Sequence, residues 1–279
     1  MKLVIVIPTF NNYDKLHDLI IFLSTIDKFD LEIVIVDSSD NPQKKCTALI
    51  GDLSIHYIYV KSDKWWTGSI LAGLEFTSTL NIHFDGLLLL NDDILLNYDI
   101  FNCLFSELNK NLECVYTSPQ INFNGSSFFG FFLSPSLKRI PYTPSNFNVS
   151  SFEIGFSNGS FLFIPYSAIN TIKRIKPERV PHLFGDIVIY LTLINHSYHV
   201  HCLNSKPLIH ISPPSSARSF PLYKVFTHNL SPFHFFSHVE ILKIFYSKMR
   251  LIGCFKYLSL LGYEFILFLL IRLKNALHV

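Results

Sequence analysis

Short apolar runs alternate with amphipathic stretches over the first ninety residues of the chain. Residues 3–7 (LVIVI) and 32–36 (EIVIV) are rich in β-branched side chains and end in turn-forming residues, which is typical of parallel strands buried on both faces. The stretch between them, residues 13–25, has helical spacing. Strand, helix and strand in this order predict a βαβ unit with a right-handed crossover, and ligands bind such units beyond the carboxyl ends of the strands. Residues 8–12 and 37–41 occupy those ends.

The same alternation continues as far as residue 93. Residues 55–60 and 86–90 are predicted strands, with a predicted helix at 68–79 between them. The second of these strands stops abruptly at an Asn-Asp-Asp turn, residues 91–93. We therefore predict an α/β fold with a mostly parallel central sheet flanked by helices.

The rest of the chain is less regular. Residues 118–151 are rich in Ser, Asn, Pro and Phe, which indicates loops and irregular strands. Beyond them, residues 161–164 and 199–203 are predicted strands on either side of a predicted helix at 186–195. An extended segment then leads to residues 209–211, and the character of the sequence changes after the Pro-Pro-Ser-Ser run at 213–216.

Composition and charge narrow the class of protein. Apolar residues make up 49% of the chain and charged residues only 16%, which excludes a disordered protein. Residues 221–279 carry seven basic and two acidic residues, so the positive charge is concentrated there. Lys256 and Glu264 interrupt the richest apolar stretch, residues 251–271, which makes a membrane-spanning helix improbable. The N-terminus shows no secretion signal, and five cysteines without a CxxC pair favour a reducing cytosol.

Five acidic or imidazole side chains are candidates for chemistry. Asp92 and Asp93 follow an apolar strand, where they could bind a hard divalent cation together with a diphosphate, although Asp also favours ordinary turns. Asp37 follows the second strand and could accept a hydrogen bond from a base or ribose. Asp186 lies at the start of a predicted helix, where it could act as a general base or simply cap the helix. His210 lies in an apolar segment and is by itself more typical of a structural histidine.

The Trp-Trp-Thr-Gly-Ser run at residues 65–69 precedes the predicted second helix. Trp66 could stack on a sugar or a base, or it could pack in the core, and Gly68 would allow close backbone approach. The chain contains no GxxxxGK[ST], GxGxxG, GxSxG or HExxH motif. This argues against P-loop, dinucleotide-binding, hydrolase and protein-only zinc chemistry.

Taken together and in this order, these segments resemble the family 2 glycosyltransferases, which have the A-type glycosyltransferase (GT-A) fold. The resemblance covers roughly residues 3–212, and the Trp-Trp-Thr-Gly pattern is most similar to rhamnosyltransferase-like members. The matching segments are residues 6–11, 35–39, 66–69 with Gly73, 90–93, Gly185 with Asp186, and His210.

The resemblance implies a role for each matching residue. Donor-binding residues are implied in the N-terminal turn, after the second strand, in the Trp-Gly turn and in the acidic turn. Asp93 and His210 would hold the metal, Mn²⁺ or Mg²⁺. Asp186 would be the general base of an inverting transfer from a nucleotide-diphosphate sugar to a hydroxyl of a glycan or lipid-linked glycan, as in surface polysaccharide synthesis. The implied donor-binding residues are Pro8, Thr9, Asn11, Asp37, Trp66, Gly68 and Asp92.

Four positions depart from the family pattern. Gly185 replaces a common Glu, Thr192 a common Arg and Leu71 a common Asn, while Asn91 replaces the first acid of the Asp-x-Asp form. These departures leave open a non-catalytic nucleotide-sugar-binding subunit of a polysaccharide assembly complex. A nucleotidyltransferase is a second alternative, which the lack of a basic Gly-rich phosphate loop disfavours.

The resemblance also implies a division of the chain. Residues 1–215 would form the catalytic domain, with a nucleotide-sugar-binding half at 1–117 and an acceptor half at 118–215. Residues 216–279 would form a basic, aromatic, mainly helical region. Its residues 240–279 could lie on the cytoplasmic face of the inner membrane, or pack on the catalytic domain or on a second copy of the chain. Nucleic acid is not an expected partner, because the basic residues lie among apolar ones.

Overall fold

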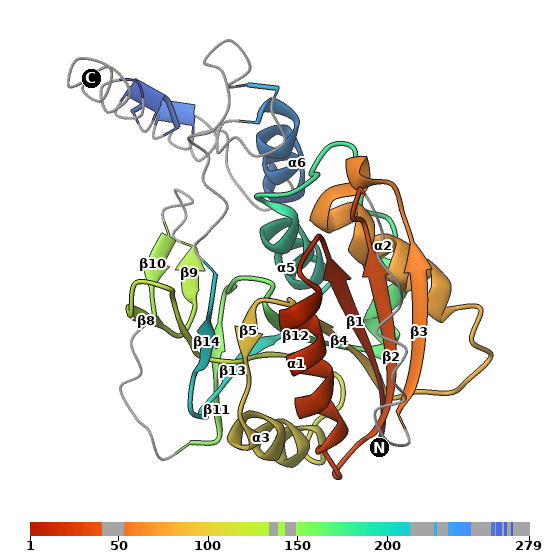
Figure 1. Cartoon of the computed structure of the whole chain (residues 1–279). Coiled ribbons are helices and arrows are strands. Elements are labelled where there is room, and N and C mark those ends of the chain that lie inside the picture. The colour runs from red at the N-terminus through yellow and green to blue at the C-terminus, as the bar shows by residue number, and fades with distance from the viewer. Residues whose placement is uncertain are drawn as a thin grey trace.

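The central element of the molecule is an eight-stranded sheet (Figure 1). The computed structural model describes residues 1–40, 53–133, 139–142, 149–212, 226–227, 234–246, 258–259, 261–263, 265–266 and 269. The strands follow the order β11-β13-β6-β12-β4-β1-β2-β3. A mostly parallel sheet flanked by helices was the prediction, and the structure confirms it.

The first four strands form one parallel group. They are β1 (Lys2–Thr9), β2 (Asp30–Asp37), β3 (Ser54–Tyr59) and β4 (Gly86–Leu90). β1 pairs in parallel with both β2 and β4, and Thr9 lies opposite Asp37. Parallel strands end at the same edge of a sheet, so the polar segments after β1, β2 and β4 meet there.

The second group of strands was only partly predicted. It consists of β6 (Val115–Thr117), β11 (Ser151–Ile154), β12 (Phe161–Pro165) and β13 (Val200–Leu203). β12 runs antiparallel to β4 and to β6, and thereby joins the parallel β6–β13 pair to the first group. β11 completes the edge as an antiparallel partner of β13. The predicted nucleotide-sugar-binding and acceptor halves therefore share one sheet.

Helices cover both faces of the sheet. Alternate residues of β1 divide between two buried clusters: Leu3 and Ile5 face one, and Val4 and Val6 face the other. This alternation is what a strand buried on both sides requires. The covering helices are α1 (Tyr13–Ser24) and α3 (Tyr98–Leu108) on the first face, and α2 (Trp65–Thr77), α4 (Ile169–Ile172) and α5 (Gly185–Asn195) on the second.

α2 starts earlier than predicted and lies very close to the sheet. It begins at Trp65 rather than at residue 68, so Trp66 belongs to the helix and not to a preceding loop, and Gly68 lies in the first turn rather than at the start. A Cβ atom added at Gly73 would lie 2.5 Å from a methyl carbon of Val6. Glycine at this position therefore allows the helix to approach β1.

The irregular region forms two small sheets, as its composition suggested. One has the order β5-β14-β7-β8, and the other pairs β9 with β10. The first matters for the site, because β14 lies between β5 and β7 and so brings residues 208–210 beside residues 94–95 and 120–121. The strands are β5 (Ile94–Leu95), β7 (Gln120–Ile121), β8 (Ser127–Phe128), β9 (Phe131–Leu133), β10 (Arg139–Pro141) and β14 (Leu208–His210), and two short 3₁₀ turns occur at η1 (Ser62–Lys64) and η2 (Tyr166–Ala168).

α6 (Phe235–Tyr246) belongs to the predicted C-terminal region and packs on the body of the protein, above α5 in Figure 1. Ile241 is buried in the same core cluster as α5. The rings of His238 and Phe184 lie 5.0 Å apart, and the Ser237 hydroxyl donates to the carbonyl oxygen of Arg179. Most of residues 216–279 fall outside the described residues. No helix in the described part of the chain is long and apolar enough to cross a membrane.

Candidate active site

Asp37 lies at the end of β2 and is almost fully buried. Its Oδ2 accepts a hydrogen bond from the Tyr13 hydroxyl (2.8 Å) and its Oδ1 accepts one from the backbone N–H of Ser39 (2.9 Å). The Ser39 hydroxyl in turn accepts from the backbone N–H of Asn11 (2.8 Å). These bonds tie the segments after β1 and β2 together, so Asp37 is a fixed acceptor at the sheet edge.

Asp92 connects the ends of β1 and β4. The Thr9 hydroxyl donates to its Oδ2 over 2.6 Å. Burial raises the pKa of Asp92 to about 6, and the negative charge of Asp93 adds to this rise. Hydrogen bonds from Thr9 and Asn12 and the positive charge of Lys15 lower the pKa and only partly compensate. Two neighbouring carboxylates, one of them costly to ionise, make a site that a cation would stabilise.

The raised pKa of Asp92 has a measurable effect on stability without metal. The unfolded chain loses this proton near pH 4 and the folded chain near pH 6. The contribution of the protonated Asp92 to the free energy of unfolding is therefore fully present below pH 4 and is lost as the pH rises to about 6. Asp92→Asn removes this loss and keeps an acceptor for Thr9. With a chelator present, we expect the variant to gain roughly 3 kcal/mol over wild type between pH 4 and pH 7.

Urea unfolding at a series of pH values measures this difference. Asp18→Asn, at an exposed position on α1, is the matched control and should show no such gain. A difference between Asp92→Asn and wild type that stays constant with pH would contradict the assigned pKa.

Asp93 and His210 are brought together by the β5–β14 ladder. The backbone N–H of Ile211 donates to the carbonyl oxygen of Asp93 (3.0 Å), and His210 pairs with the residue after Asp93. Burial lowers the pKa of His210 and the charge of Asp93 opposes this fall. The net lowering keeps the imidazole neutral at pH 7, as a metal ligand must be.

Gln120 fixes the orientation of the His210 ring. His210 Nε2 lies 2.8 Å from Gln120 Oε1 and 3.3 Å from Asn158 Nδ2. A carboxamide oxygen can only accept, so the shorter contact assigns the proton to Nε2, which donates to Gln120 and leaves Nδ1 unprotonated. The Asn158 amide nitrogen is itself a donor and then forms no hydrogen bond with Nε2. Gln120 is fully buried, which makes this hydrogen bond a rigid support. An imidazole held through one nitrogen, with the other unprotonated, is the usual arrangement of a metal-binding histidine.

The residues present fit a divalent cation that is shared with a ligand. Among the described residues no group of three or more His, Cys, Asp or Glu side chains could hold a metal alone. Asp93 and His210 could supply two ligands, Asp92 would add negative charge beside them, and diphosphate oxygens and water could complete the shell.

Asn91 has a structural role that explains its departure from an acid. Its side-chain oxygen accepts from Trp66 Nε1 (2.9 Å), and its amide nitrogen donates to the Ser160 hydroxyl (3.3 Å). Its backbone N–H also bonds the Ser160 carbonyl oxygen. The amide thus links the start of α2 to β4 and β12 through one donor and one acceptor, which a carboxylate could not supply.

Asp186 lies in the first turn of α5, and its Oδ2 accepts from the backbone N–H of Gly159 (3.3 Å). Added Cβ atoms show why glycines surround it. At Gly159 the Cβ would lie 2.8 Å from the ring of Trp66, and at Gly185 it would lie 2.0 Å from Thr67 Oγ1 and 3.0 Å from the same ring. The Trp66 ring therefore contacts both glycines, and Asp186 is positioned against this packing.

The remaining predicted donor-binding residues lie in packed positions. Pro8 is buried in β1 opposite Val36. Gly68 lies inside α2, where an added Cβ would be 3.1 Å from the Lys64 side chain and 3.7 Å from Pro177. Their donor contacts, like those of the residues above, stay predictions.

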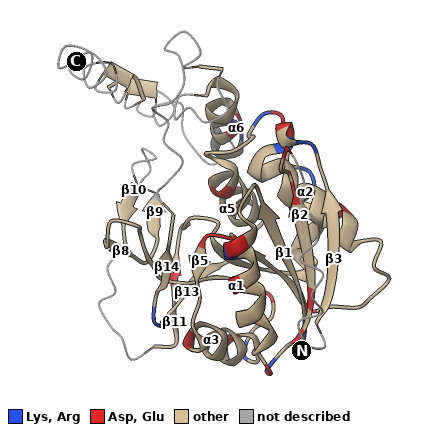
Figure 2. Ribbon diagram, in the orientation of Figure 1, with Lys and Arg blue, Asp and Glu red and all other residues tan. Residues whose placement is uncertain are grey.

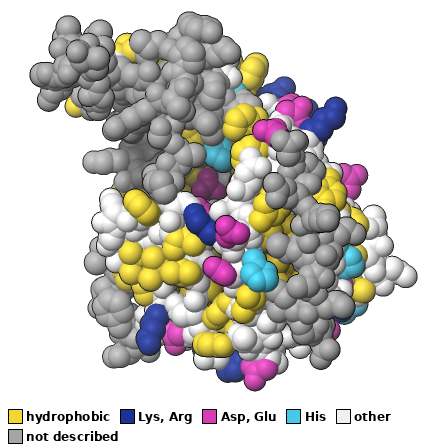
Figure 3. Space-filling model, in the orientation of Figure 1, with side chains coloured by type: hydrophobic (Ala, Val, Ile, Leu, Met, Phe, Trp, Pro, Cys, Tyr) yellow, Lys and Arg dark blue, Asp and Glu magenta, His cyan; other side chains and the backbone are white. Residues whose placement is uncertain are grey.

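Several residues of the site carried no usable sequence signal. Tyr13 and Ser39 lie close to recognised segments, but Gln120, Asn158 and Gly159 come from irregular stretches without a motif. Lys15 on α1 donates a hydrogen bond to the Ser212 hydroxyl after β14, and so connects α1 to the segment that follows His210. Figure 2 shows acidic and basic residues together at the start of α1, and Figure 3 shows acidic, basic and histidine side chains gathered at the centre of this face.

Comparison with known proteins shows the fold but no close relative. The sequence matches no protein-family model and no curated protein. The structure is similar to GalNAc-T7 crystallised with UDP, GalNAc and Mn²⁺, with a TM-score of 0.65 and 13% identity over 88% of this chain and 48% of that one. It is also similar to TarS residues 1–349 from S. aureus in complex with UDP-GlcNAc, with a TM-score of 0.60 and 11% identity over 93% and 79% of the two chains. The chain spans about half of GalNAc-T7. Both have the GT-A fold, and this chain has it too.

Proposed function

We propose that the chain is an inverting, metal-dependent glycosyltransferase that moves a sugar from a nucleotide-diphosphate donor to a hydroxyl of a glycan or lipid-linked glycan. One observation carries this proposal. On a GT-A fold, Asp37, Asp92 and Asp93 lie at one sheet edge, His210 comes to Asp93 from β14, and Asp186 opens α5. Such an arrangement offers an acceptor for a base, ligands for a metal and a carboxylate for a proton.

Each group would act on a different part of the reaction. Asp37, held by Tyr13 and Ser39, would accept a hydrogen bond from the base, and Thr9 with Asp92 would orient the ribose. A divalent cation bound by Asp93 and His210 would supply neutralisation of the charge on the leaving diphosphate. Asp186 would take the proton of the acceptor hydroxyl as it attacks the anomeric carbon from the opposite face.

The departures from the family pattern lie outside the side chains to which the proposed chemistry is assigned, which favours an enzyme over a non-catalytic subunit. Gly185 has no room for a side chain beside Thr67 and Trp66. Thr192 lines a cavity between α4, α5 and α6, and Leu71 packs against the core. None of the three therefore removes a group on which the proposed chemistry depends.

The finer features of the proposal come from the sequence. A rhamnosyltransferase-like donor preference and a role in surface polysaccharide synthesis follow from the resemblance. A place at the cytoplasmic face of the inner membrane follows from the cysteine usage and from the basic, aromatic C-terminal region. Contact of residues 240–279 with the membrane would give access to a lipid-linked acceptor. Among the described residues of this region, Leu258, Tyr263 and Ile266 are exposed apolar side chains, which supports that contact.

A panel of nucleotide sugars tests the proposal directly. UDP sugars come first, since the similar structures contain UDP, UDP-GlcNAc or both UDP and GalNAc. We expect at least one donor to raise the melting temperature in the presence of Mn²⁺ or Mg²⁺, because a ligand that binds only the folded state stabilises it. The same donor should have a smaller effect with a chelator. A complete panel without any metal-dependent shift would contradict the proposal.

A further inference from the structure

A second concave feature lies away from the sheet edge, between α4, α5 and α6. It is a cavity of about 260 Å³, which also includes side chains from the segment after α4. Among the described residues, its lining contains four basic side chains, Arg174, Lys176, Arg179 and Lys243, and a single acidic one, Glu240. Neither the sequence motifs nor the proposed transfer reaction makes use of this cavity.

The positive charge of the cavity is only partly compensated. Glu240 Oε1 accepts from Arg179 Nη1 (2.6 Å) and from Lys243 Nζ (3.0 Å), so one carboxylate serves two cations. Burial works against ionisation of Glu240, but these two hydrogen bonds and charges lower its pKa and keep it ionised. Arg174 and Lys176 are exposed and form no ion pair with any described residue. The cavity therefore has a surplus of positive charge.

The floor of the cavity is apolar. Ile175, Val180 and Val188 line it and are buried in the core. Charges beside such a surface are less screened than charges in open water, so an anion there would interact more strongly with the basic side chains. Guanidinium groups and ammonium groups are the usual partners of phosphate.

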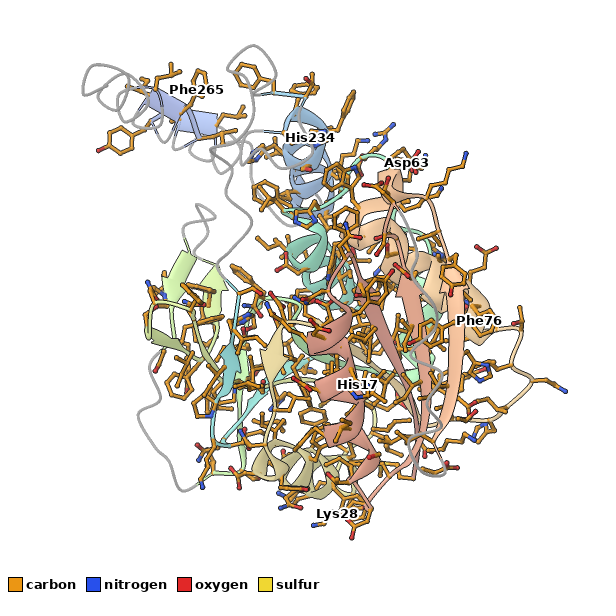
Figure 4. The ribbon with its side chains drawn as sticks, viewed as in Figure 1. His17, Lys28, Asp63, Phe76, His234 and Phe265 are labelled. Carbon is orange, nitrogen blue, oxygen red and sulfur yellow. The ribbon has the colours of Figure 1, made fainter. Side chains whose placement is uncertain are left out.

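Exposed aromatic side chains lie next to this charge. Phe235 and Phe236, at the start of α6, are 57% and 50% exposed. Phe236 precedes Glu240 by four residues and so lies on the same side of the helix, one turn away. Figure 4 labels His234 at this end of α6, far from Lys28 at the opposite end of the molecule. Basic residues beside exposed aromatic residues are typical of a surface that binds an anionic membrane.

We propose that the cavity between α4, α5 and α6 binds the phosphate group of an anionic phospholipid, with Arg174 and Lys176 as its principal contacts. The charge surplus selects an anion, and the exposed phenylalanines select a lipid surface over a free ion. The proposal deepens the membrane contact of the preceding subsection by naming its site. Its test measures binding and does not depend on sugar transfer.

Vesicle sedimentation of the full chain provides the test. Wild type should bind vesicles of phosphatidylcholine with phosphatidylglycerol and not vesicles of phosphatidylcholine alone. The double variant Arg174→Ser, Lys176→Ser should bind the anionic vesicles at least about tenfold more weakly. The matched control is Lys28→Ser, Lys206→Ser, which removes two exposed charges elsewhere and should stay within about twofold of wild type.

Two further measurements separate a phosphate site from general attraction. Glu240→Gln should strengthen binding, because it removes the one acid among the described lining residues and releases Arg179 and Lys243 from it. Inorganic phosphate should displace wild type from the vesicles more than chloride does at equal ionic strength. The proposal is overturned if both double variants lose binding equally, if wild type ignores the anionic vesicles, or if the cavity binds inorganic phosphate only.

Discussion

Replacing Asp186 with Asn is expected to lower the rate of sugar transfer by about 10²–10⁴-fold, the usual contribution of a general base. Asn has nearly the same shape and can still accept the hydrogen bond from the Gly159 N–H, which Asp186 now accepts over 3.3 Å. It cannot take the proton of an attacking hydroxyl. The loss should appear in kcat at saturating donor and acceptor, because the residue acts on the acceptor in the transition state.

Donor binding separates this role from a structural one. Calorimetric affinity for the nucleotide sugar should remain within about twofold of wild type, since neither the base nor the metal would touch Asp186. Asp63→Asn, an exposed aspartate in η1, is a control that should leave both kcat and affinity unchanged. Wild-type turnover in Asp186→Asn, or an equal loss of donor affinity, would remove Asp186 as the base.

Gly185 departs from the family pattern at a position where the structure gives a packing reason for glycine. Next to the expected base, glycine in place of glutamate suggested a degenerate site. The structure gives a different reason: a side chain at this position would overlap Thr67, which lies 118 residues earlier in the chain. Sequence spacing alone does not reveal such a contact, because it arises from the crossing of α2 and α5.

The parallel strands could be predicted because their signal is local. β1, β2 and β4 each contain four or five consecutive apolar residues, a signal that can be recognised without the neighbouring strands. α3 was not predicted, although its signal is local too: Asn97 caps it by accepting from the N–H of Ile100, and its apolar residues follow helical spacing. β5 and β7 have two residues each, and their existence depends on β14. No local pattern specifies strands of this length.

The residues of the site also divide into those with a local sequence signal and those whose position depends on a distant partner. Asp37 and Asp92 follow recognisable strands, so their position at the sheet edge could be derived from sequence. His210 reaches Asp93 only through the β5–β14 ladder, and sequence indicated it only by resemblance. Gln120, which fixes the His210 ring, comes from a short strand without any motif. Residues that act through a partner distant in sequence are those that required the structure.

Asp93→Ala is expected to abolish the metal dependence of donor binding. Without this carboxylate, His210 remains as a single ligand beside Asp92, whose ionisation burial already disfavours. Loss of a group that merely supports a metal ligand typically weakens metal affinity by 10–100-fold, so loss of a ligand itself should cost at least about 100-fold. Calorimetric titration with nucleotide sugar in Mn²⁺ and in chelator measures the difference.

The chelator titration also distinguishes a lost metal from a damaged fold. Contacts of Thr9 and Asp37 with the nucleoside do not require the cation, so the weak affinity without metal should be the same in wild type and in Asp93→Ala. Asp93→Asn should behave like Asp93→Ala, because it keeps the size of the side chain but loses the charge that attracts the metal. If Mn²⁺ strengthens donor binding equally in wild type and in both variants, Asp93 is not the metal ligand. The bonds that bring His210 to its side would then be purely structural, like those of Asn91 with Trp66 and Ser160.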